Sequence, residues 1–122
     1  FYWGDDPDPA YANTRRNEGR DVFEFTSPVR SFPTNPWGLY DMAGNVWEMT
    51  ADCIYPDYVG APADGTARMR DGCTRFVTRG GDYSSSRRGQ KPTARGGAGV
   101  DQRSTSLGFR VAQDVPETGA AN

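Results

Sequence analysis

Histidine is absent from this 122-residue chain, and only two cysteines are present. The missing imidazole excludes Ser-His-Asp triads, histidine acid–base catalysis and histidine metal ligands within the chain. Two cysteines without histidine are too few ligands for a zinc site, and they do not form a C-x-x-C redox motif. No apolar run approaches the roughly 18 residues that a transmembrane helix needs. We therefore expect neither a zinc site nor direct membrane insertion.

Apolar residues are also scarce. They make up 35% of the chain, against ~45–50% in globular proteins, although that usual figure includes glycine. Fifteen glycines and nine prolines indicate many turns and few long elements. Alternating apolar residues predict strands over 75–79 and 107–112, a strand end over 49–53 and a weak strand over 21–25. The expected fold is α+β, irregular and loop-rich, with a disordered tail over 113–122.

Charge is unevenly distributed along the chain. The net charge is −2, but residues 1–78 carry −5 and residues 79–110 carry +5, and thirteen of the fourteen basic residues are arginine. Two Arg-Gly-Gly triplets, at 79–81 and 95–97, superficially resemble RNA-binding tracts. The repeats are few and the chain is slightly acidic overall, so we expect no nucleic-acid binding. The segment 84–104 is then either an arginine-rich surface loop paired with the acidic half or a ligand-facing loop. Its candidate ligand residues are Ser85, Arg87, Arg88, Arg95 and Arg103.

The most distinctive stretch runs from Asn35 to Glu48. It combines three large aromatic residues with a Gly44-Asn45 turn and with two acidic residues, Asp41 and Glu48. One interpretation is a turn between core strands whose acids face solvent. The other is a site for a hard cation such as calcium, formed by turn carbonyls and carboxylates. The residue types alone leave both open.

Cys53 and Cys73 bracket a loop that is rich in proline, glycine, aspartate and alanine. They form either a disulfide or two buried thiols. A disulfide closing a loop of roughly 20 residues contributes on the order of 3 kcal/mol in the chain-entropy model. It implies an oxidising compartment, either periplasmic or extracellular.

Together with Arg79-Gly80-Gly81 and Leu107-Gly108-Phe109-Arg110, the 35–48 stretch resembles the formylglycine-generating enzyme (sulfatase-modifying factor) family. The resemblance runs over residues 2–112 and implies an irregular fold related to C-type lectins, with short antiparallel strands. It covers only the C-terminal half of a family domain, which we assign to 1–112. The aromatic start at Phe1 suggests a fragment or a processed product. The expected partner is the missing N-terminal half or another protein in a complex.

The resemblance also implies two calcium ions. The first would be bound by the Asn13 side chain, the Thr14 carbonyl, the Asp21 carboxylate and the Phe23 carbonyl. The second would be bound by Asp41, the Gly44 and Val46 carbonyls, and Glu48. All four side-chain positions carry oxygen, so the resemblance favours the cation interpretation of the 35–48 stretch.

Catalysis is not implied in the same way. Active members oxidise a substrate cysteine with two cysteines that hold copper, and Ser85 and Gln90 fall about where those cysteines should be. Neither residue forms a thiolate copper site, so no copper is expected. A related branch, in ergothioneine synthesis, uses iron on histidines, which this chain lacks. Cys53 and Cys73 lie where many secreted relatives carry a structural pair.

Three functions remain in competition. The first is a non-catalytic, calcium-stabilised binding or assembly module outside the cytoplasm, as a subunit of a larger complex. The second is an oxidoreductase of the formylglycine-generating type, or a related enzyme, whose active residues lie in the missing half or in a partner. The third is lectin-like ligand display through the 84–104 loop.

Overall fold

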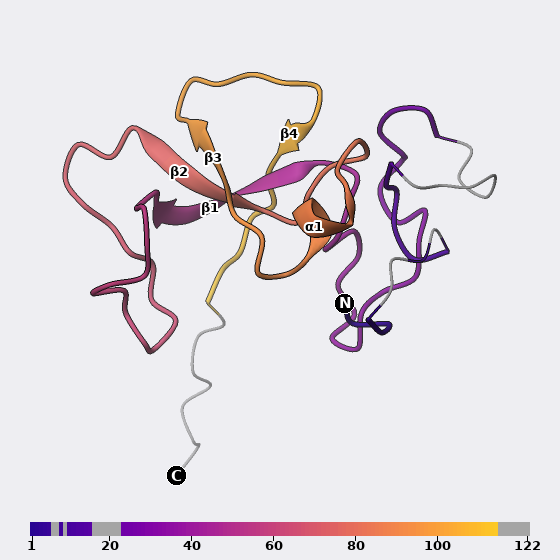
Figure 1. Cartoon of the computed structure of the whole chain (residues 1–122), viewed down its shortest axis with the longest axis horizontal. Coiled ribbons are helices and arrows are strands. Elements are labelled where there is room, and N and C mark those ends of the chain that lie inside the picture. Colours follow the sequence, from indigo (N-terminus) through magenta and orange to yellow (C-terminus); the bar gives the residue numbers. More distant parts are fainter. Residues whose placement is uncertain (6–7, 9, 16–22, 115–122) are drawn as a thin grey trace, which may run out of the picture.

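A computed structural model covers the chain and describes residues 1–5, 8, 10–15 and 23–114. Within these residues a small sheet is surrounded by long loops, and helix is almost absent (Figure 1). The elements are β1 (Trp47–Cys53), β2 (Arg75–Arg79), α1 (Arg87–Gln90), β3 (Gly96–Gly99) and β4 (Leu107–Gly108). None of the helices in the described part is long and apolar enough to cross a membrane. The loop-rich fold expected from composition is confirmed.

The sheet has the strand order β3-β2-β1-β4. β2 pairs antiparallel with both β1 and β3, as expected, whereas β4 runs parallel to β1. The chain after β3 crosses from one edge of the sheet to the other before β4 begins (Figure 1). This crossover explains the parallel pairing, because a strand that follows such a connection need not reverse direction.

The strand predictions have mixed outcomes. The prediction over 75–79 matches β2, and 49–53 is the end of β1. The prediction over 107–112 is right only for Leu107–Gly108, because no described strand pairs with the residues that follow. β3 was missed, since its sequence, GGAG, carries almost no side chains to show a period. Residues 23–25 form no strand, and 21–22 lie outside the described residues, as does most of the predicted tail.

The interior contains more polar than apolar residues. Among the described residues, the buried apolar ones are Ala12, Ala43, Cys53, Val77 and Ala98, whereas the buried polar ones are Asn13, Thr14, Ser27, Asn35, Asn45, Thr78, Asp82 and Gln90. A polar group removed from water is costly unless it is hydrogen-bonded. The loops of this fold are therefore specified by hydrogen bonds more than by a large apolar core.

Asn45 is the centre of that hydrogen bonding. Its backbone N–H donates to the Asn13 carbonyl at 2.9 Å, and its carbonyl accepts from Tyr83 N at 3.0 Å. Its side-chain oxygen accepts from Ser27 N at 2.8 Å. One residue thus connects three segments that lie far apart in the sequence. The neighbouring Gly44 has φ +75°, and a Cβ there would collide with the Asn13 carbonyl oxygen. Glycine is required at this position for both reasons.

Candidate functional site

Asn13 supplies the clearest indication of a cation site. Its side chain is only 1% exposed, and its Nδ2 donates to the Phe25 carbonyl at 2.7 Å. That orientation leaves Oδ1 buried without a hydrogen-bond partner. An unpartnered buried amide oxygen is costly in a polar interior, and it is a ligand that calcium accepts. Of the other predicted ligands, Thr14 is buried and Phe23 is half-buried, while Asp21 lies outside the described residues. The orphaned Asn13 Oδ1 fits a calcium ligand, and the first calcium site stays a prediction.

The second predicted site is arranged differently. The Arg110 guanidinium forms a fork on Glu48, with Nε 2.6 Å from Oε2 and Nη2 2.5 Å from Oε1. Nη2 also donates to the carbonyl oxygens of Tyr40 (3.0 Å) and Asp41 (3.3 Å). The hydrogen bond to Glu48 is the main reason why the pKa of Arg110 is raised. The charge of Glu48 is thus neutralised within the chain.

Asp41 lies beside this ion pair with φ 55°, and its Oδ2 accepts from Arg30 N at 2.9 Å. Asp41 and Glu48 line one open cavity of about 380 Å³, together with Val46 and Arg110. No group of three His, Cys, Asp or Glu side chains suited to a metal ion occurs within the described ranges. A calcium ion here would share Glu48 with Arg110, so the fit is poorer than at Asn13. The second calcium site stays a prediction.

Ser85 and Gln90, at the positions expected for the copper-binding cysteines, are part of a polar network. The buried Asp82 accepts at Oδ1 from Ser84 N (3.0 Å), Ser84 Oγ (3.0 Å) and Ser85 Oγ (2.7 Å). Gln90 is 3% exposed, and its Nε2 donates to the Ser85 carbonyl at 2.6 Å. These contacts hold the turn before α1 and leave neither side chain placed as a soft metal ligand.

An open groove of about 1090 Å³ lies next to this turn, beside α1. Three of the five predicted ligand-loop residues line it: Arg87, Arg88 and Arg95. Ser85 lies half-buried in the turn network, and Arg103 is exposed in the crossover between β3 and β4. Sequence reasoning missed Trp47 and Lys91, which also line the groove. Lys91 lies inside the predicted segment, but Trp47 comes from β1, and nothing local in the sequence connects it with α1.

Two glycines, Gly89 and Gly96, lie beside Trp47. A Cβ at Gly89 would lie 3.8 Å from the indole, and one at Gly96 would lie 3.6 Å from it. A Cβ at Gly96 would also collide with Thr78 Oγ1. Both distances to the indole are ordinary contacts, so Gly96 is required by the packing against Thr78 and not by Trp47.

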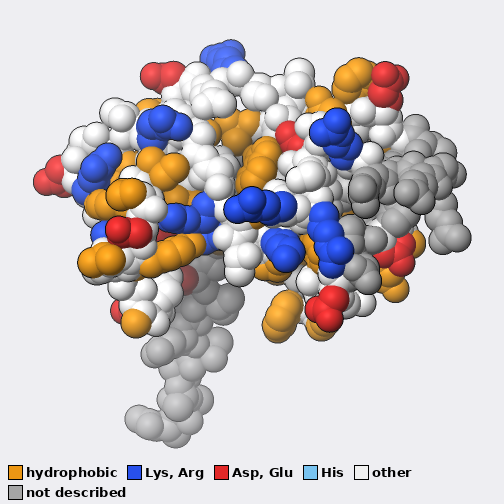
Figure 2. Space-filling view, viewed as in Figure 1, with side chains coloured by type: hydrophobic (Ala, Val, Ile, Leu, Met, Phe, Trp, Pro, Cys, Tyr) orange, Lys and Arg blue, Asp and Glu red, His pale blue; other side chains and the backbone are white. Residues whose placement is uncertain are grey.

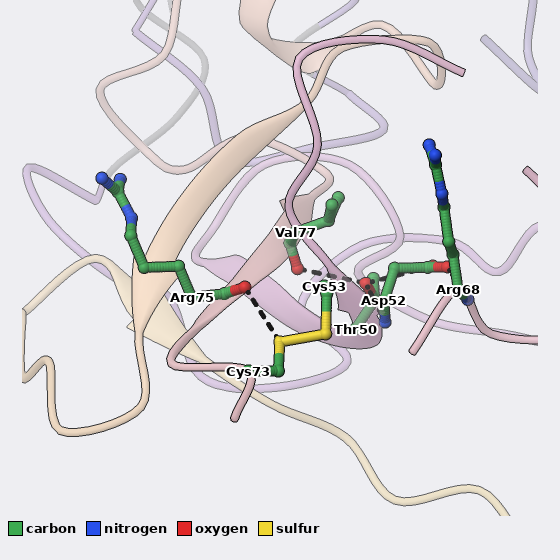
Figure 3. The surroundings of a disulfide bond; sticks show 7 residues. All are labelled: Thr50, Asp52, Cys53, Arg68, Cys73, Arg75 and Val77. Carbon is green, nitrogen blue, oxygen red and sulfur yellow. Dashed lines mark hydrogen bonds between the residues drawn. A yellow bond between two sulfur atoms is a disulfide. The ribbon is translucent and has the colours of Figure 1, made fainter. Parts of the chain in front are cut away.

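The two cysteines form a disulfide that links Cys53, the last residue of β1, to Cys73, which lies two residues before the start of β2 (Figure 3). Their Cα atoms are 6.0 Å apart, and Cys53 is buried. Asp52 Oδ1 accepts from Arg68 N at 2.8 Å in the same region. The Arg68 guanidinium also stacks on the Tyr55 ring, 3.6 Å from its centroid. The disulfide interpretation of the cysteine pair is confirmed, and the loop that it closes is held by arginine contacts as well.

Comparisons with known proteins give a family match and several similar relatives. Residues 1–115 match the model of the "Sulfatase-modifying factor enzyme 1-like domain" family. The chain is 33% identical to a formylglycine-generating enzyme of Bos taurus, over 98% of this chain and 35% of that protein. It is 35% identical to an inactive C-alpha-formylglycine-generating enzyme 2 of Bos taurus, over 92% of this chain and 36% of that protein.

A solved structure, PvdO from Pseudomonas aeruginosa, is also similar in fold and sequence. It superposes with a TM-score of 0.68 at 41% identity, over 82% of this chain and 38% of PvdO. The chain thus spans about a third of the length of the relatives that it matches. The match of the family model over nearly the whole chain shows that this protein belongs to the sulfatase-modifying factor enzyme 1-like domain family.

Proposed function

We propose that this chain is part of a non-catalytic, calcium-stabilised binding domain of the sulfatase-modifying factor family that acts outside the cytoplasm. Its fold would be the C-type-lectin-like fold that the resemblance implies. The domain would be completed by the rest of a family domain, in the same polypeptide or in a partner protein.

The observation that carries the proposal is the polar network at Ser85 and Gln90. A hydroxyl bonded to Asp82 and a buried amide bonded to a carbonyl are neutral oxygen and nitrogen groups. Copper(I) prefers thiolate or thioether sulfur. The chain has two cysteines in all, and both are in the disulfide. No thiol of this chain is left for copper. The similarity to a relative named inactive supports the same conclusion.

The test is copper-dependent oxidation of a cysteine-containing peptide by the purified full-length protein. A formylglycine-generating enzyme serves as the positive control under the same conditions. We expect no turnover. Turnover that survives Ser85→Ala and Gln90→Ala would instead favour an enzyme whose active residues lie outside this chain. Turnover that these substitutions abolish would place an active site here. Either result would overturn the proposal.

Calcium would serve stability in this proposal. Asn13 Oδ1 and the Thr14 and Phe23 carbonyls, with Asp21, would hold the ion, and its charge would hold together loops that have little apolar surface to bury. The orphaned, buried Oδ1 supports this role. An ion that binds only the folded state stabilises it by mass action.

The expected partner surface carries exposed apolar side chains. Trp37 is 80% exposed, Phe109 78% and Val111 87%. Phe109 and Val111 follow β4 with the alternation of a strand, yet no described strand pairs with them. We propose that the rest of the family domain covers them. Hydrogen exchange at 109–112 should then be slow in the full-length protein and fast in this chain alone. Equally fast exchange in both would contradict the assignment.

The proposed location follows from the disulfide, which persists only where thiols are kept oxidised. Thiol labelling of the protein in fractionated cells should find Cys53 and Cys73 unreactive and the protein outside the cytoplasm. A cytoplasmic protein with two reactive thiols would refute the location.

A further inference from the structure

A smaller cavity, of about 190 Å³, lies between the sheet and the loop that the disulfide closes. Five of the residues that line it are arginines or tyrosines: Tyr55, Tyr58 and Arg68 from the loop, Arg79 from the end of β2, and Arg95 from just before β3. Figure 2 shows Lys and Arg side chains next to hydrophobic side chains, the class that includes tyrosine, at the left of the view, where Figure 1 places this loop. Most ligand pockets measure roughly 300–1000 Å³, whereas one water takes up ~30 Å³. This cavity therefore has room for a small ion and not for a drug-sized molecule.

The guanidinium groups of the three arginines are half-buried and held in place. Arg68 donates to two carbonyl oxygens of the loop at 3.0 and 2.5 Å, and Arg95 donates to two others, both at 3.3 Å. Arg79 donates from Nη1 to two carbonyl oxygens between α1 and β3, at 3.0 and 3.2 Å, and from Nη2 to the Tyr58 hydroxyl at 3.0 Å. Arg68 also lies 3.6 Å from the centroid of the Tyr55 ring, and Arg95 lies 4.3 Å from that of Tyr58. The positions of all three charges are thus fixed by neutral groups.

These contacts leave donors unused. A guanidinium has five N–H donors, and the hydrogen bonds above use two or three of them on each arginine. All of these bonds come from Nη atoms, so no Nε–H of the three donates to another residue in the described part of the chain. A positioned guanidinium with open donors is suited to an oxyanion, which it can bind through two parallel hydrogen bonds.

The carboxylates at the cavity do not neutralise these arginines. Asp52 and Asp57 also line it, yet neither forms an ion pair with any of the three among the described residues. Each accepts at Oδ1 from a backbone N–H instead, Asp52 from Arg68 N at 2.8 Å and Asp57 from Val59 N at 3.0 Å. Three cations and two anions leave an excess of one positive charge at a concave site, which attracts an anion.

The arrangement of the donors favours a tetrahedral anion. The three guanidinium groups come from three separate segments of the chain, whereas a carboxylate offers only two oxygens in one plane. The Tyr58 hydroxyl accepts from Arg79 and keeps its own proton for donation. We infer that this cavity binds a small tetrahedral oxyanion, phosphate or sulfate, either as a free ion or as the terminal ester group of a larger ligand. Anion binding here does not depend on whether the domain is catalytic.

The test is isothermal titration calorimetry of the full-length protein at pH 8 with inorganic phosphate, inorganic sulfate and chloride, at matched ionic strength. We expect at least one tetrahedral anion to bind and chloride not to bind. Phenyl phosphate and phenyl sulfate, titrated in the same way, distinguish the two sources of the anion. Binding of an ester as tight as that of the inorganic ion indicates the end of a larger ligand, and weaker binding indicates a free ion.

Three variants locate the site. Arg68→Gln should weaken binding about tenfold, because a charged hydrogen-bonding group is lost. Arg70→Gln is the matched control and should leave binding within about twofold. Arg70 lies in the same loop, 5.3 Å from the centroid of the Tyr55 ring, but is outside the cavity lining. Asp57→Asn keeps an acceptor for Val59 N and removes a negative charge from the lining, so it should strengthen binding by about twofold or more.

Thermal melts check that each variant folds, and if Arg68→Gln does not fold, Asp57→Asn decides alone. The inference is overturned if neither tetrahedral anion binds, or if chloride binds as tightly as they do. Equal losses in Arg68→Gln and Arg70→Gln would also overturn it, because they would indicate a response to surface charge in general. Unchanged or weaker binding in Asp57→Asn would do the same.

Discussion

Breaking the Cys53–Cys73 disulfide should destabilise this chain strongly. The bond joins residues that are 20 apart in the sequence. Closing a loop of this length removes conformational entropy from the unfolded chain that corresponds to about 3 kcal/mol. Total stabilities of single domains are only about 5–15 kcal/mol. The loss is therefore a large fraction of the stability of a chain with so few buried apolar residues.

Breaking the disulfide should lower stability mainly by raising the conformational entropy of the unfolded state, because the folded loop keeps other contacts. Arg68 donates from Nη1 to the Asp57 carbonyl at 3.0 Å and from Nη2 to the Val59 carbonyl at 2.5 Å. Its own carbonyl accepts from Cys53 N at 2.9 Å. Arg79 Nη2 donates to the Tyr58 hydroxyl at 3.0 Å. None of these bonds needs the cross-link.

The measurement is thermal unfolding of the oxidised chain, the reduced chain and the variant Cys53→Ala/Cys73→Ala. For a domain of this size about 1 kcal/mol shifts Tm by roughly 4 °C, so we expect a decrease of about 12 °C on reduction. The reduced chain keeps both sulfur atoms, so its comparison with the double variant separates loss of the cross-link from loss of side-chain packing at the buried Cys53. Equal melting temperatures for the oxidised and reduced chains would refute the reasoning.

Three further perturbations test other parts of the structure. Chelation of calcium should lower Tm by several degrees in the native chain and by much less in the variant Asn13→Ala, as measured by differential scanning fluorimetry. An unchanged Tm of the native chain on chelation would reject the calcium assignment. Gly44→Ala should lower the free energy of unfolding by more than about 1 kcal/mol in chemical denaturation, because the added Cβ meets the Asn13 carbonyl and φ is positive. Gly65→Ala also has a positive φ but open space around the added Cβ, so it should lower the free energy of unfolding by less. Glu48→Gln and Arg110→Gln should show a coupling of roughly 0.2–1 kcal/mol in a double-mutant cycle, because the pair is partly exposed. Additive effects of the two substitutions would mean that the fork contributes nothing to stability.

One pH effect follows from Tyr2, whose pKa is raised from its ordinary value of 10.0 mainly by burial and then by Asp41. A raised pKa in the folded state means that the neutral phenol is favoured there. Its contribution to stability is present below pH 10 and is lost as the pH rises through the folded pKa. Comparison of Tyr2→Phe with the native chain above pH 10 should show a shallower decline in the variant, and identical declines would exclude Tyr2 as the cause.

The sequence predicted those parts of the fold that depend on local chemistry. Alternating Phe76 and Thr78 identified β2, and the glycine-asparagine pair at 44–45 identified the turn before β1. Prediction was poor where pairing decided the outcome. Phe109 and Val111 alternate as a strand would, but a strand needs a partner, and no described strand supplies one.

The sequence by itself determined the family, the loop-rich fold, the absence of any cysteine besides Cys53 and Cys73, and hence the one pairing partner available to Cys53. These follow from residue identity and order along the chain. Only the tertiary structure decided that Trp47 lies beside α1, that Arg110 neutralises Glu48 and that Asn13 Oδ1 is left without a partner. Each of these depends on contacts between segments that are separated in the sequence: 62 residues for Glu48 and Arg110, and 12 for Asn13 and Phe25. Such contacts are set by the global packing of loops and strands, which the local pattern of side chains does not encode.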